Sequence, residues 1–314
     1  MAASDAVPQQ SAKRGSGAGF WQDDMRRAEA RAAFFFLLPG LLGFLIFLLF
    51  PLVASFAMSF TNWKLIGTPK FIGIANYVRL FTKDPSFYSV LGNTLFYTAE
   101  YLVLNIVLAL GLAVWISSLK RGKIFFRVVF FLPTFAPLIG ISIVWLLMFT
   151  PNGLFDSLVR ALGLPLPNLL LDPAGAMQAV VLVSLWAGVG YNLVLFNAAL
   201  ELVPKSYLEA AALDGAGPWA RFWRIRLPLI SPTLFFGAVM TGITALQVFD
   251  QIYALTRGGP GTATQTLGFS IYQTGFSNYL MGYAAAISWV MFAIIMALTA
   301  FQFRMQRKWV HYGV

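Results

Sequence analysis

The feature that most constrains this chain is a series of long apolar runs that carry almost no charge. The first run, residues 32–60, holds no Asp, Glu, Lys or Arg. Because an α-helix rises about 1.5 Å per residue, about 20 such residues already cross the ~30 Å hydrocarbon layer of a bilayer. Backbone groups in that layer must pair within their own segment, so we expect this run to form a membrane-spanning helix.

Further runs of the same kind follow along the chain. The expected spans are residues 32–60, 93–118, 124–149, 176–200, 229–255 and 281–303. Over the whole chain 59% of residues are hydrophobic and 11% are charged, whereas about 25% are charged in a typical soluble domain. The sequence therefore predicts an all-α integral membrane protein: a polar tail over residues 1–31, then a domain of six transmembrane helices over residues 32–314.

The basic residues indicate the direction in which the chain crosses the membrane. Sixteen of the 22 Lys and Arg residues lie in the N-terminal tail, the 119–127 turn, the 201–228 loop and the C-terminus, and six lie in the other connections. Cytoplasmic loops carry the excess of Lys and Arg. We therefore expect both termini and the 201–228 loop to be cytoplasmic. This asymmetry accounts for the net charge of +10 without a nucleic-acid partner.

Several kinds of chemistry are excluded. The chain has no cysteine and one histidine, His311, so it offers neither a disulfide framework nor a thiolate or His-rich metal site. It also lacks a Walker A sequence, a nucleophile elbow, an HExxH motif and a convincing pair of carboxylates. We expect no catalytic and no metal-binding residue, so energy for any work that the protein does must come from a partner or from an ion gradient.

The 201–228 loop has the pattern of two short helices separated by a turn. Pro204 can open the first helix, and the alanines that follow Glu209 are strong helix formers. Gly215 and Gly217 can take positive φ in the turn. Pro218 can then start the second helix and Pro228 can end it. Composition alone fits an ordinary cytoplasmic loop equally well.

The order of residues in this loop is more specific than its composition. The residues concerned are Glu209, Ala210, Ala211, Asp214, Gly215 and Ala216, followed by Phe222, Ile225, Leu227, Pro228 and Pro232. This order resembles the EAA loop of ABC importer membrane subunits. The chain is similar to the permeases of binding-protein-dependent sugar importers, a group that includes the maltose and glycerol-3-phosphate permeases.

The resemblance implies a type I importer permease fold in a bacterial or archaeal cytoplasmic membrane. It implies that the EAA loop is a coupling helix, which docks on a separate ATPase dimer. The implied partners also include a second permease subunit, commonly non-identical, and an external solute-binding protein. ATP and Mg²⁺ would be bound by the ATPase, and this chain would bind no cofactor. A carbohydrate is the implied solute, with glycerol 3-phosphate or another polyol-type solute as the alternative.

Polar and small residues inside two expected spans are candidates for the solute pathway. They are Ser184, Trp186, Gly188 and Tyr191 in the fourth span and Thr241, Thr244 and Val248 in the fifth. Aromatic rings can stack on a sugar and hydroxyls can hydrogen-bond it. By the resemblance, these positions coincide with those that line the sugar site of the maltose permease, although their identities match only in part. The alternative is that small and hydroxyl residues pack helices together.

Other intramembrane polar residues leave their roles open. Asp250 could meet solute, cap a cavity or reach the interface, and Glu100 is expected to extend to water. Asn192 and Asn197 could bridge helices instead of binding a ligand. Glu201 is expected to pair with a nearby base such as Lys205.

Three external segments have simple interpretations. The 71–81 segment and part of the 151–175 segment are expected to form short helices that lie on the membrane surface. The Arg257-Gly258-Gly259-Pro260-Gly261 segment is expected to form a tight turn. Its resemblance to a signature of the family makes contact with the external binding protein the second interpretation.

Two functions of other classes compete with an ABC importer. A secondary transporter needs carboxylates for a coupling ion near the middle of the bilayer, and it commonly shows internal repeats. An intramembrane enzyme needs clustered acids, a histidine or a Ser/Lys pair inside its spans. We find neither pattern in this sequence.

Overall fold

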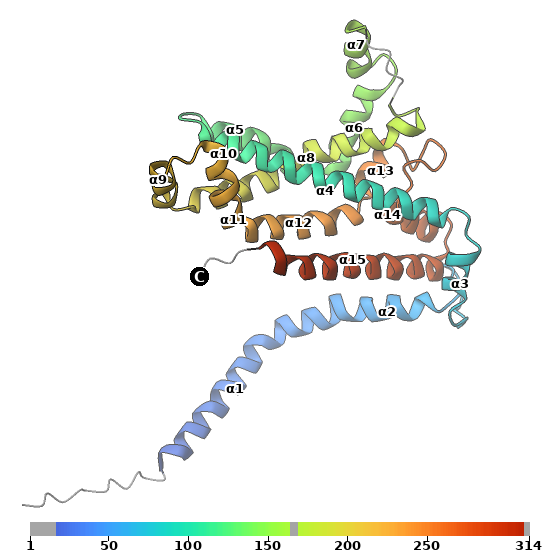
Figure 1. Cartoon of the computed structure of the whole chain (residues 1–314). Helices are drawn as coiled ribbons and strands as arrows, with labels where there is room; N and C mark the ends of the chain where they lie inside the picture. Colours follow the sequence, from blue (N-terminus) through green and yellow to red (C-terminus); the bar gives the residue numbers. More distant parts are fainter. Residues whose placement is uncertain (1–16, 164–168, 311–314) are drawn as a thin grey trace, which may run out of the picture. The chain divides into compact units, whose positions relative to one another are not determined.

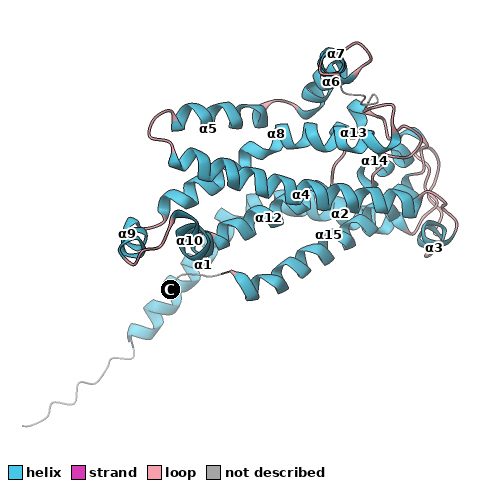
Figure 2. Cartoon of the chain, turned by 45° about the horizontal axis from the view of Figure 1, so that its top comes forward, coloured by secondary structure: helices cyan, strands magenta, loops and turns pink. Residues whose placement is uncertain are grey.

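The computed structural model describes residues 17–163 and 169–310, and in this part of the chain the regular structure is helical (Figures 1 and 2). The α-helices are α1 (Gly17–Phe44), α2 (Phe50–Ser59), α3 (Ala75–Thr82), α4 (Phe87–Ser118), α5 (Lys123–Phe131), α6 (Leu138–Phe149), α7 (Leu154–Ala161), α8 (Pro173–Leu202), α9 (Lys205–Leu213), α10 (Pro218–Arg221), α11 (Leu227–Leu229), α12 (Ser231–Leu246), α13 (Asp250–Leu255), α14 (Leu267–Tyr272) and α15 (Met281–Trp309). Shorter 3₁₀ or π segments are η1 (Leu45–Leu49), η2 (Leu132–Phe135), η3 (Phe222–Arg226) and η4 (Gln273–Ser277). The predicted all-α fold is confirmed.

The chain divides into two compact units, which meet between Ser55 and Phe56. In the first unit the helical path runs through α1 and η1 into α2, and Pro39 lies inside α1. The apolar stretch Glu29–Ser59 is 31 residues long with a mean hydropathy of 2.6, and none of its most apolar window is buried. A helix this apolar and this exposed is suited to contact with lipid.

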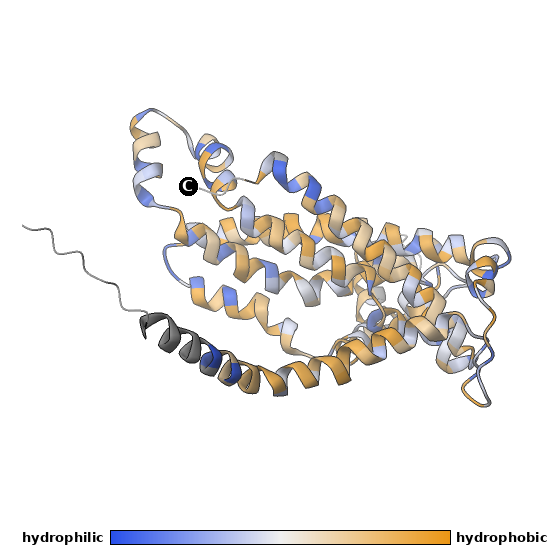
Figure 3. Ribbon diagram, turned by 90° about the horizontal axis from the view of Figure 1, so that it is seen from below, coloured by the Kyte–Doolittle hydropathy of each residue, from blue (hydrophilic) through white to orange (hydrophobic). Residues whose placement is uncertain are grey.

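The second unit contains three more helices that are long and apolar enough to cross a membrane. They are Phe87–Ser118, Pro173–Leu202 and Met281–Arg307. With Glu29–Ser59 these make four, and two bent helix pairs bring the number of candidate spans in the described part of the chain to as many as six. In Figure 3 apolar residues cover most of each long helix, and hydrophilic residues gather toward helix ends and in the loops.

The bent pairs replace two of the spans that the sequence predicts as single runs. Within residues 124–149 the chain turns by 99° between Lys123–Phe135 and Leu138–Phe149. Pro133 and Pro137 lie at this bend, and each removes a backbone N–H that a continuous helix needs. Pro218–Leu229 and Ser231–Leu246 form the second pair, bent by 67°. Helix α12 then ends well before residue 255, and α13 starts at Asp250 after a break.

Helix α8 is the centre of the second unit. Its apolar window is 61% buried, against 22% for the corresponding windows of α4 and α15. It packs against α4 along its length and also contacts α5, α12 and α13. Glycine allows the closest of these approaches, since a Cβ on Gly190 would lie 2.2 Å from the carbonyl oxygen of Phe130.

Candidate functional site

A cavity of about 440 Å³ opens in the second unit beside α8. Its walls come from α4, the bend between α5 and α6, α8, and the break between α12 and α13. The lining residues are Tyr97, Tyr101, Thr134, Leu138, Ser184, Ala187, Gly188, Thr244, Ala245, Gln247, Val248, Phe249, Asp250 and Gln251. Hydroxyl, amide, carboxylate and aromatic groups therefore converge on one space inside the helical bundle.

Two tyrosines of α4 form one wall of this cavity. The rings of Tyr97 and Tyr101 are stacked, with centroids 5.6 Å apart and planes 5° from parallel. The hydroxyl of Tyr97 donates to Ser184 Oγ at 2.8 Å. The hydroxyl of Tyr101 occupies the space beside Gly188, where a Cβ would lie only 2.2 Å from it. Glycine at position 188 is therefore what lets the Tyr101 ring lie against α8.

The break after α12 supplies the opposite wall. Helix α12 ends at Leu246 and α13 starts at Asp250, so the intervening residues leave the helical path at the cavity. The hydroxyl of Thr266 donates to the carbonyl oxygen of Val248 at 3.2 Å, which satisfies one backbone acceptor of the break. Gln247 and Asp250 thereby bring polar side chains to the cavity.

Next to the cavity, a buried series of hydrogen-bonded polar side chains joins α4, α8 and α12. Asn192 Nδ2 donates to Asn105 Oδ1 and to Thr241 Oγ1, both at 2.7 Å. Asn105 Nδ2 in turn donates to the hydroxyl of Tyr101 at 3.3 Å. Asn197, further along α8, donates to the carbonyl oxygen of Ala113 at 3.1 Å. Both asparagines thus bridge helices.

The structure brings together some of the pathway residues predicted from the sequence and separates others. Those that line the cavity are Ser184, Gly188, Thr244 and Val248. Thr241 does not line it, because this residue lies one turn deeper, is 6% exposed and bonds Asn192.

The two predicted aromatic residues lie outside the cavity. Trp186 is two positions after Ser184, which turns it about 200° around the helix at 3.6 residues per turn. Its side chain borders a separate apolar hollow of about 580 Å³ against α6. Tyr191 shares the face of Ser184 but lies beyond the cavity, and these two aromatic side chains are 45% and 46% exposed.

Sequence reasoning missed the tyrosine wall on α4. Tyr97, Tyr101 and Asn105 recur at intervals of four residues, which places them on one helix face. That pattern was available in the second expected span. Gln247, Asp250 and Gln251 reach the cavity through the break after α12, and no proline or glycine within residues 247–249 marks this break in the sequence.

The 201–228 loop forms the expected helix, turn and second helix. Helix α9 ends at Leu213, Gly215 has φ of +81°, and α10 starts at Pro218. The amide of Ala216 donates to the carbonyl oxygen of Ala211 at 2.8 Å, which closes the turn. Gly217 does not take positive φ; its φ is −68°, because a residue before proline favours an extended backbone.

The second helix ends one residue after Pro228, close to the expected position. The helical path continues through η3 and α11 as far as Leu229. The π segment η3 (Phe222–Arg226) ends two residues before this proline and changes the hydrogen-bond pattern of the turn to which a proline N–H would belong. The predicted motif residues Glu209, Ala210, Asp214 and Gly215 are exposed, whereas Ala211 and Ala216 are half-buried.

Several large apolar side chains near these motif residues in the sequence are also exposed. Leu213 is 90% exposed, Trp219 is 74% exposed, and Tyr207 is also exposed.

Two acidic residues near span ends have protein partners. Glu100 accepts a hydrogen bond from Gln178 Nε2 at 3.2 Å. Glu201 does not pair with Lys205 as expected, because Arg127 of α5 reaches it across the helix interface and donates to its carboxylate. Among the described residues, no group of three or more His, Asp or Glu side chains could hold a metal ion.

An acidic residue outside the spans fixes the start of α4. Tyr283 donates to Asp84 Oδ2 at 2.7 Å, and Ser86 donates to Oδ1 through its amide and its hydroxyl. The guanidinium of Arg79 lies 4.3 Å from the centroid of the Tyr283 ring. Burial raises the pKa of Asp84, but these hydrogen bonds and the charge of Arg79 together outweigh it and hold the pKa below its ordinary value of 3.8.

The 257–261 segment forms the predicted tight turn. Arg257, Gly258 and Gly261 have positive φ, and Thr264 Oγ1 donates to the carbonyl oxygen of Gly259 at 2.8 Å. Asn93 of α4 donates to the carbonyl oxygens of the following segment at 2.8 and 3.1 Å. The turn is thus held near the N-terminal end of α4, and its contact with a binding protein stays a prediction. The predicted surface helices correspond to α3 and α7.

A family model described as the binding-protein-dependent transport system inner membrane component matches residues 105–311. The chain belongs to this family. It is therefore a transport component and a multi-pass protein of the inner membrane, and the predicted resemblance to ABC importer permeases is confirmed.

Three relatives illustrate the range of this permease family. The probable ABC transporter permease protein YesP of Bacillus subtilis is 34% identical over 91% of this chain and 94% of the relative. The sn-glycerol-3-phosphate transport system permease protein UgpA of Agrobacterium fabrum is 39% identical over 77% and 83%. The multiple sugar-binding transport system permease protein MsmF of Streptococcus mutans is 36% identical over 87% and 94%.

A solved structure supports the fold of this permease. A chain of a bacterial alginate ABC transporter, crystallised with a periplasmic protein bound to alginate pentasaccharide, matches with a TM-score of 0.80. The match covers 94% of this permease and 99% of that chain at 23% sequence identity. It establishes that the two chains share a fold.

Proposed function

We propose that this permease is one membrane-spanning subunit of an ATP-driven importer for a neutral carbohydrate. It forms half of the translocation pathway, and a second, non-identical permease subunit forms the other half. A separate ATPase dimer docks on the 201–228 loop through Glu209, Ala210, Ala211, Asp214, Gly215 and Ala216, and an external solute-binding protein delivers the solute. The names of the relatives MsmF and UgpA support import of a sugar or a polyol-type solute.

The polar cavity carries this proposal. At about 440 Å³ it falls within the ~300–1,000 Å³ of small-molecule sites. Ser184, Thr244 and Gln247 offer hydroxyl and amide groups to a solute rich in hydroxyls, and the rings of Tyr97 and Tyr101 offer an apolar surface. A sugar has both kinds of surface. Thr241 and Tyr191 extend the proposed pathway along the helices beyond this cavity, and Trp186 belongs to it from the neighbouring hollow against α6.

The charge of the cavity favours a neutral solute over a phosphorylated one. Asp250 is among the lining residues, and the described residues that line the cavity include no lysine or arginine. A phosphate group would meet a like charge there with no basic partner. Glycerol 3-phosphate is the alternative, and the identity of 39% with UgpA favours it.

The mechanism that follows is alternating access. Closure of the ATPase dimer on ATP moves the docked α9, and the spans rock so that the cavity opens outward. The binding protein releases its solute there, and hydrolysis returns the cavity to the inward-open state. In this proposal both termini and the 201–228 loop are cytoplasmic, as the distribution of basic residues indicates. ATP and Mg²⁺ are bound by the ATPase, and this permease binds no cofactor.

Ligand screening of the cognate binding protein tests the proposed substrate class. We expect neutral mono-, di- or oligosaccharides to raise its melting temperature, since a ligand at 100 times its Kd stabilises by about 2.7 kcal/mol. Glycerol 3-phosphate should leave it unchanged. A shift with phosphorylated polyols alone would contradict the proposed neutral substrate.

A further inference from the structure

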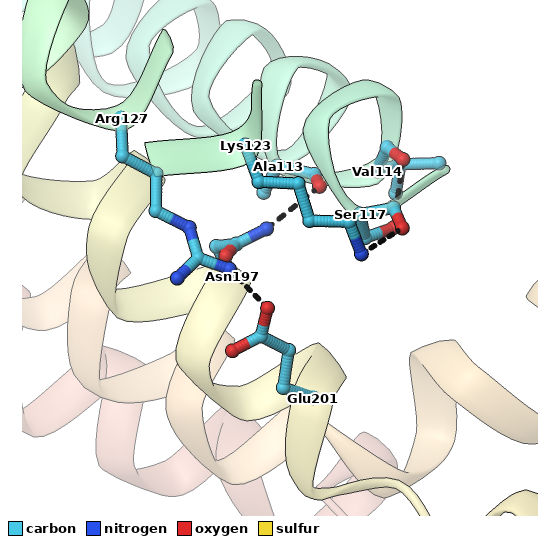
Figure 4. Close-up of polar contacts among 7 residues, drawn as sticks. All are labelled: Ala113, Val114, Ser117, Lys123, Arg127, Asn197 and Glu201. Atoms are coloured by element: carbon cyan, nitrogen blue, oxygen red, sulfur yellow. Dashed lines mark hydrogen bonds and ion pairs between the residues drawn. The ribbon is translucent and has the colours of Figure 1, made fainter. Parts of the chain in front are cut away.

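An ion pair joins α5 to the end of α8 close to the proposed coupling helix. Arg127 Nη2 donates to Glu201 Oε1 (Figure 4). Glu201 is the last residue but one of α8, and α9 starts only four positions later at Lys205. Little chain therefore separates this pair from the segment that we propose docks on the ATPase.

A second set of contacts lies one helical turn from this pair on each helix. Lys123, four residues before Arg127, donates from Nζ to the carbonyl oxygen of Ser117 at 2.8 Å. Asn197, four residues before Glu201, donates to the carbonyl oxygen of Ala113 at 3.1 Å. Residues four apart share a helix face. Arg127, Glu201, Lys123 and Asn197 thus form a three-helix clamp at one end of α4, α5 and α8 (Figure 4).

The connection from the clamp to α9 is short and constrained. Val203, between the two helices, is buried in the same apolar cluster as α4 and α8 residues. Pro204, the next residue, has its φ fixed by its ring. A displacement of α9 cannot be absorbed by a flexible linker here, so it must reach the end of α8.

The two helices that α8 meets at the clamp both lead to the cavity. Helix α5 continues through η2, which carries Thr134, to the bend at the cavity wall. Helix α4 carries Tyr97 and Tyr101, the aromatic wall. The clamp therefore connects the proposed docking loop to two separate walls of the solute site.

Some hydrogen-bonding atoms of the clamp have no partner among the described residues. Arg127 Nε and Asn197 Oδ1 are both buried, and neither has a hydrogen-bond partner among the described residues. Leaving such groups unpaired costs free energy, so a rearrangement that pairs them gains some of it back. The side chains of Arg127 and Glu201 are 28% and 46% exposed, so water can solvate both charges when the pair separates.

From this geometry we propose that Arg127 and Glu201 are positioning residues that transmit movement of α9 to α5 and α4. The proposal rests on the proposed function, in which the ATPase moves α9. The pair holds the end of α8 against α5, so that a force on α9 displaces the cavity walls and not α8 alone.

The test uses the full complex, with both permease subunits and the ATPase dimer, in sealed vesicles. This chain has no cysteine, so Thr244→Cys provides a single thiol in the cavity wall. A membrane-impermeant maleimide then reports outward opening, read on the band of this chain, with and without MgATP and vanadate. The variants are Arg127→Gln, Glu201→Gln and the charge swap Arg127→Glu with Glu201→Arg. Arg121→Gln removes a charge from the exposed turn before α5 and is the matched control.

In the Thr244→Cys reference, trapping with vanadate should raise the labelling rate at least about fivefold, the lower range of coupling between sites. Each single variant should lose this response while it still co-purifies with the ATPase and keeps basal ATP hydrolysis. The charge swap should recover it, and Arg121→Gln should retain it.

Three results overturn the assignment of the pair: single variants that respond like the reference, a charge swap that recovers nothing, or loss of ATPase co-purification in a single variant. The last result would make the pair a requirement for assembly. If the Thr244→Cys reference itself shows no response to trapping, the proposed function is contradicted. The role proposed for Arg127 and Glu201 then loses its basis as well.

Discussion

Gly188 shows how closely single residues determine the cavity. The hydroxyl of Tyr101 fills the position where a Cβ of residue 188 would lie, and Tyr101 is held there by its stack on Tyr97 and by Asn105. The tyrosine ring is therefore held against α8 as one wall of the cavity. At this scale, function depends on small contacts between α4 and α8.

We expect Gly188→Ala to weaken solute handling without preventing assembly. The added methyl group must displace Tyr101, and overpacking of this kind costs about 1–3 kcal/mol. The apparent affinity for solute in uptake should fall about tenfold, the equivalent of about 1.4 kcal/mol. Gly92→Ala, also in a long helix but with no atom within 4 Å of the new Cβ, is the control. Equal affinities for the two variants would contradict the fit between Tyr101 and Gly188.

Asp250→Asn tests the role of charge in choosing the solute. The amide keeps the size of the side chain and removes the negative charge from the cavity. Because two like charges about 4 Å apart repel by about 4 kcal/mol at the effective dielectric of a protein surface, discrimination against glycerol 3-phosphate should decrease at least about tenfold. Competition by glycerol 3-phosphate in sugar uptake measures this change. Gln247→Glu adds a charge to the same wall and should act in the opposite direction; unchanged competition in both variants would speak against electrostatic selection.

At the scale of helices, the sequence predicts where apolar segments lie better than where they bend. The fourth and sixth expected spans correspond to α8 and α15, because uninterrupted apolar runs have no other way to pair their backbone. The 99° bend at Pro133 and Pro137 has a recognisable cause in the sequence. The break at Gln247–Phe249 has none, because contacts with distant residues such as Thr266 stabilise it.

In the candidate site, too, the sequence predicts local backbone features better than it predicts tertiary contacts. The turn at Gly215 was predictable, since a local need for positive φ selects glycine. The partner of Glu201 was not, because Arg127 is 74 residues away in the sequence and only the packing of α5 on α8 brings it near. Residues whose role depends on local backbone geometry were thus easier to find than those whose role depends on tertiary contacts.

Gly215→Pro should separate insertion from ATPase binding. Proline cannot take the φ of +81° that this turn requires, so the geometry between α9 and α10 is lost while the spans are unaffected. We expect normal membrane insertion and no co-purifying ATPase. Gly217→Ala, at a residue with negative φ and open space around it, should bind the ATPase normally. Full ATPase recovery with Gly215→Pro would show that docking does not use this turn.

Asp84 should make the N-terminal end of α4 sensitive to acid. Its pKa is lower in the folded chain than the ordinary value of 3.8, so the ionised carboxylate stabilises the fold above that value. This contribution is lost as the pH falls through the folded-state pKa. Because the residue is partly exposed, the effect is no more than about 1 kcal/mol.

Thermal unfolding of detergent-purified protein measures this contribution. The wild-type protein should melt above Asp84→Asn at about pH 6, and the difference should shrink as the pH approaches about 3. A difference that stays constant or grows in acid would show that Asp84 does not act through its ionised form.

At the scale of the whole molecule, the proposed function assigns partner chains to two exposed regions. Trp186 and Tyr191 are half-exposed beside and beyond the cavity, and Leu213 and Trp219 are exposed on the 201–228 loop. In the proposed complex, these residues lie where partner chains would bind. A second permease would cover the former, and the ATPase the latter.

Reconstitution in sealed vesicles tests the central claim most directly. The probe is the neutral sugar that stabilises the cognate binding protein, and the measurement is its accumulation against a gradient. We expect accumulation only when both permease subunits, the ATPase dimer, the binding protein and ATP are all present. Accumulation by this permease alone, driven by an ion gradient and without any ATPase, would contradict the claim.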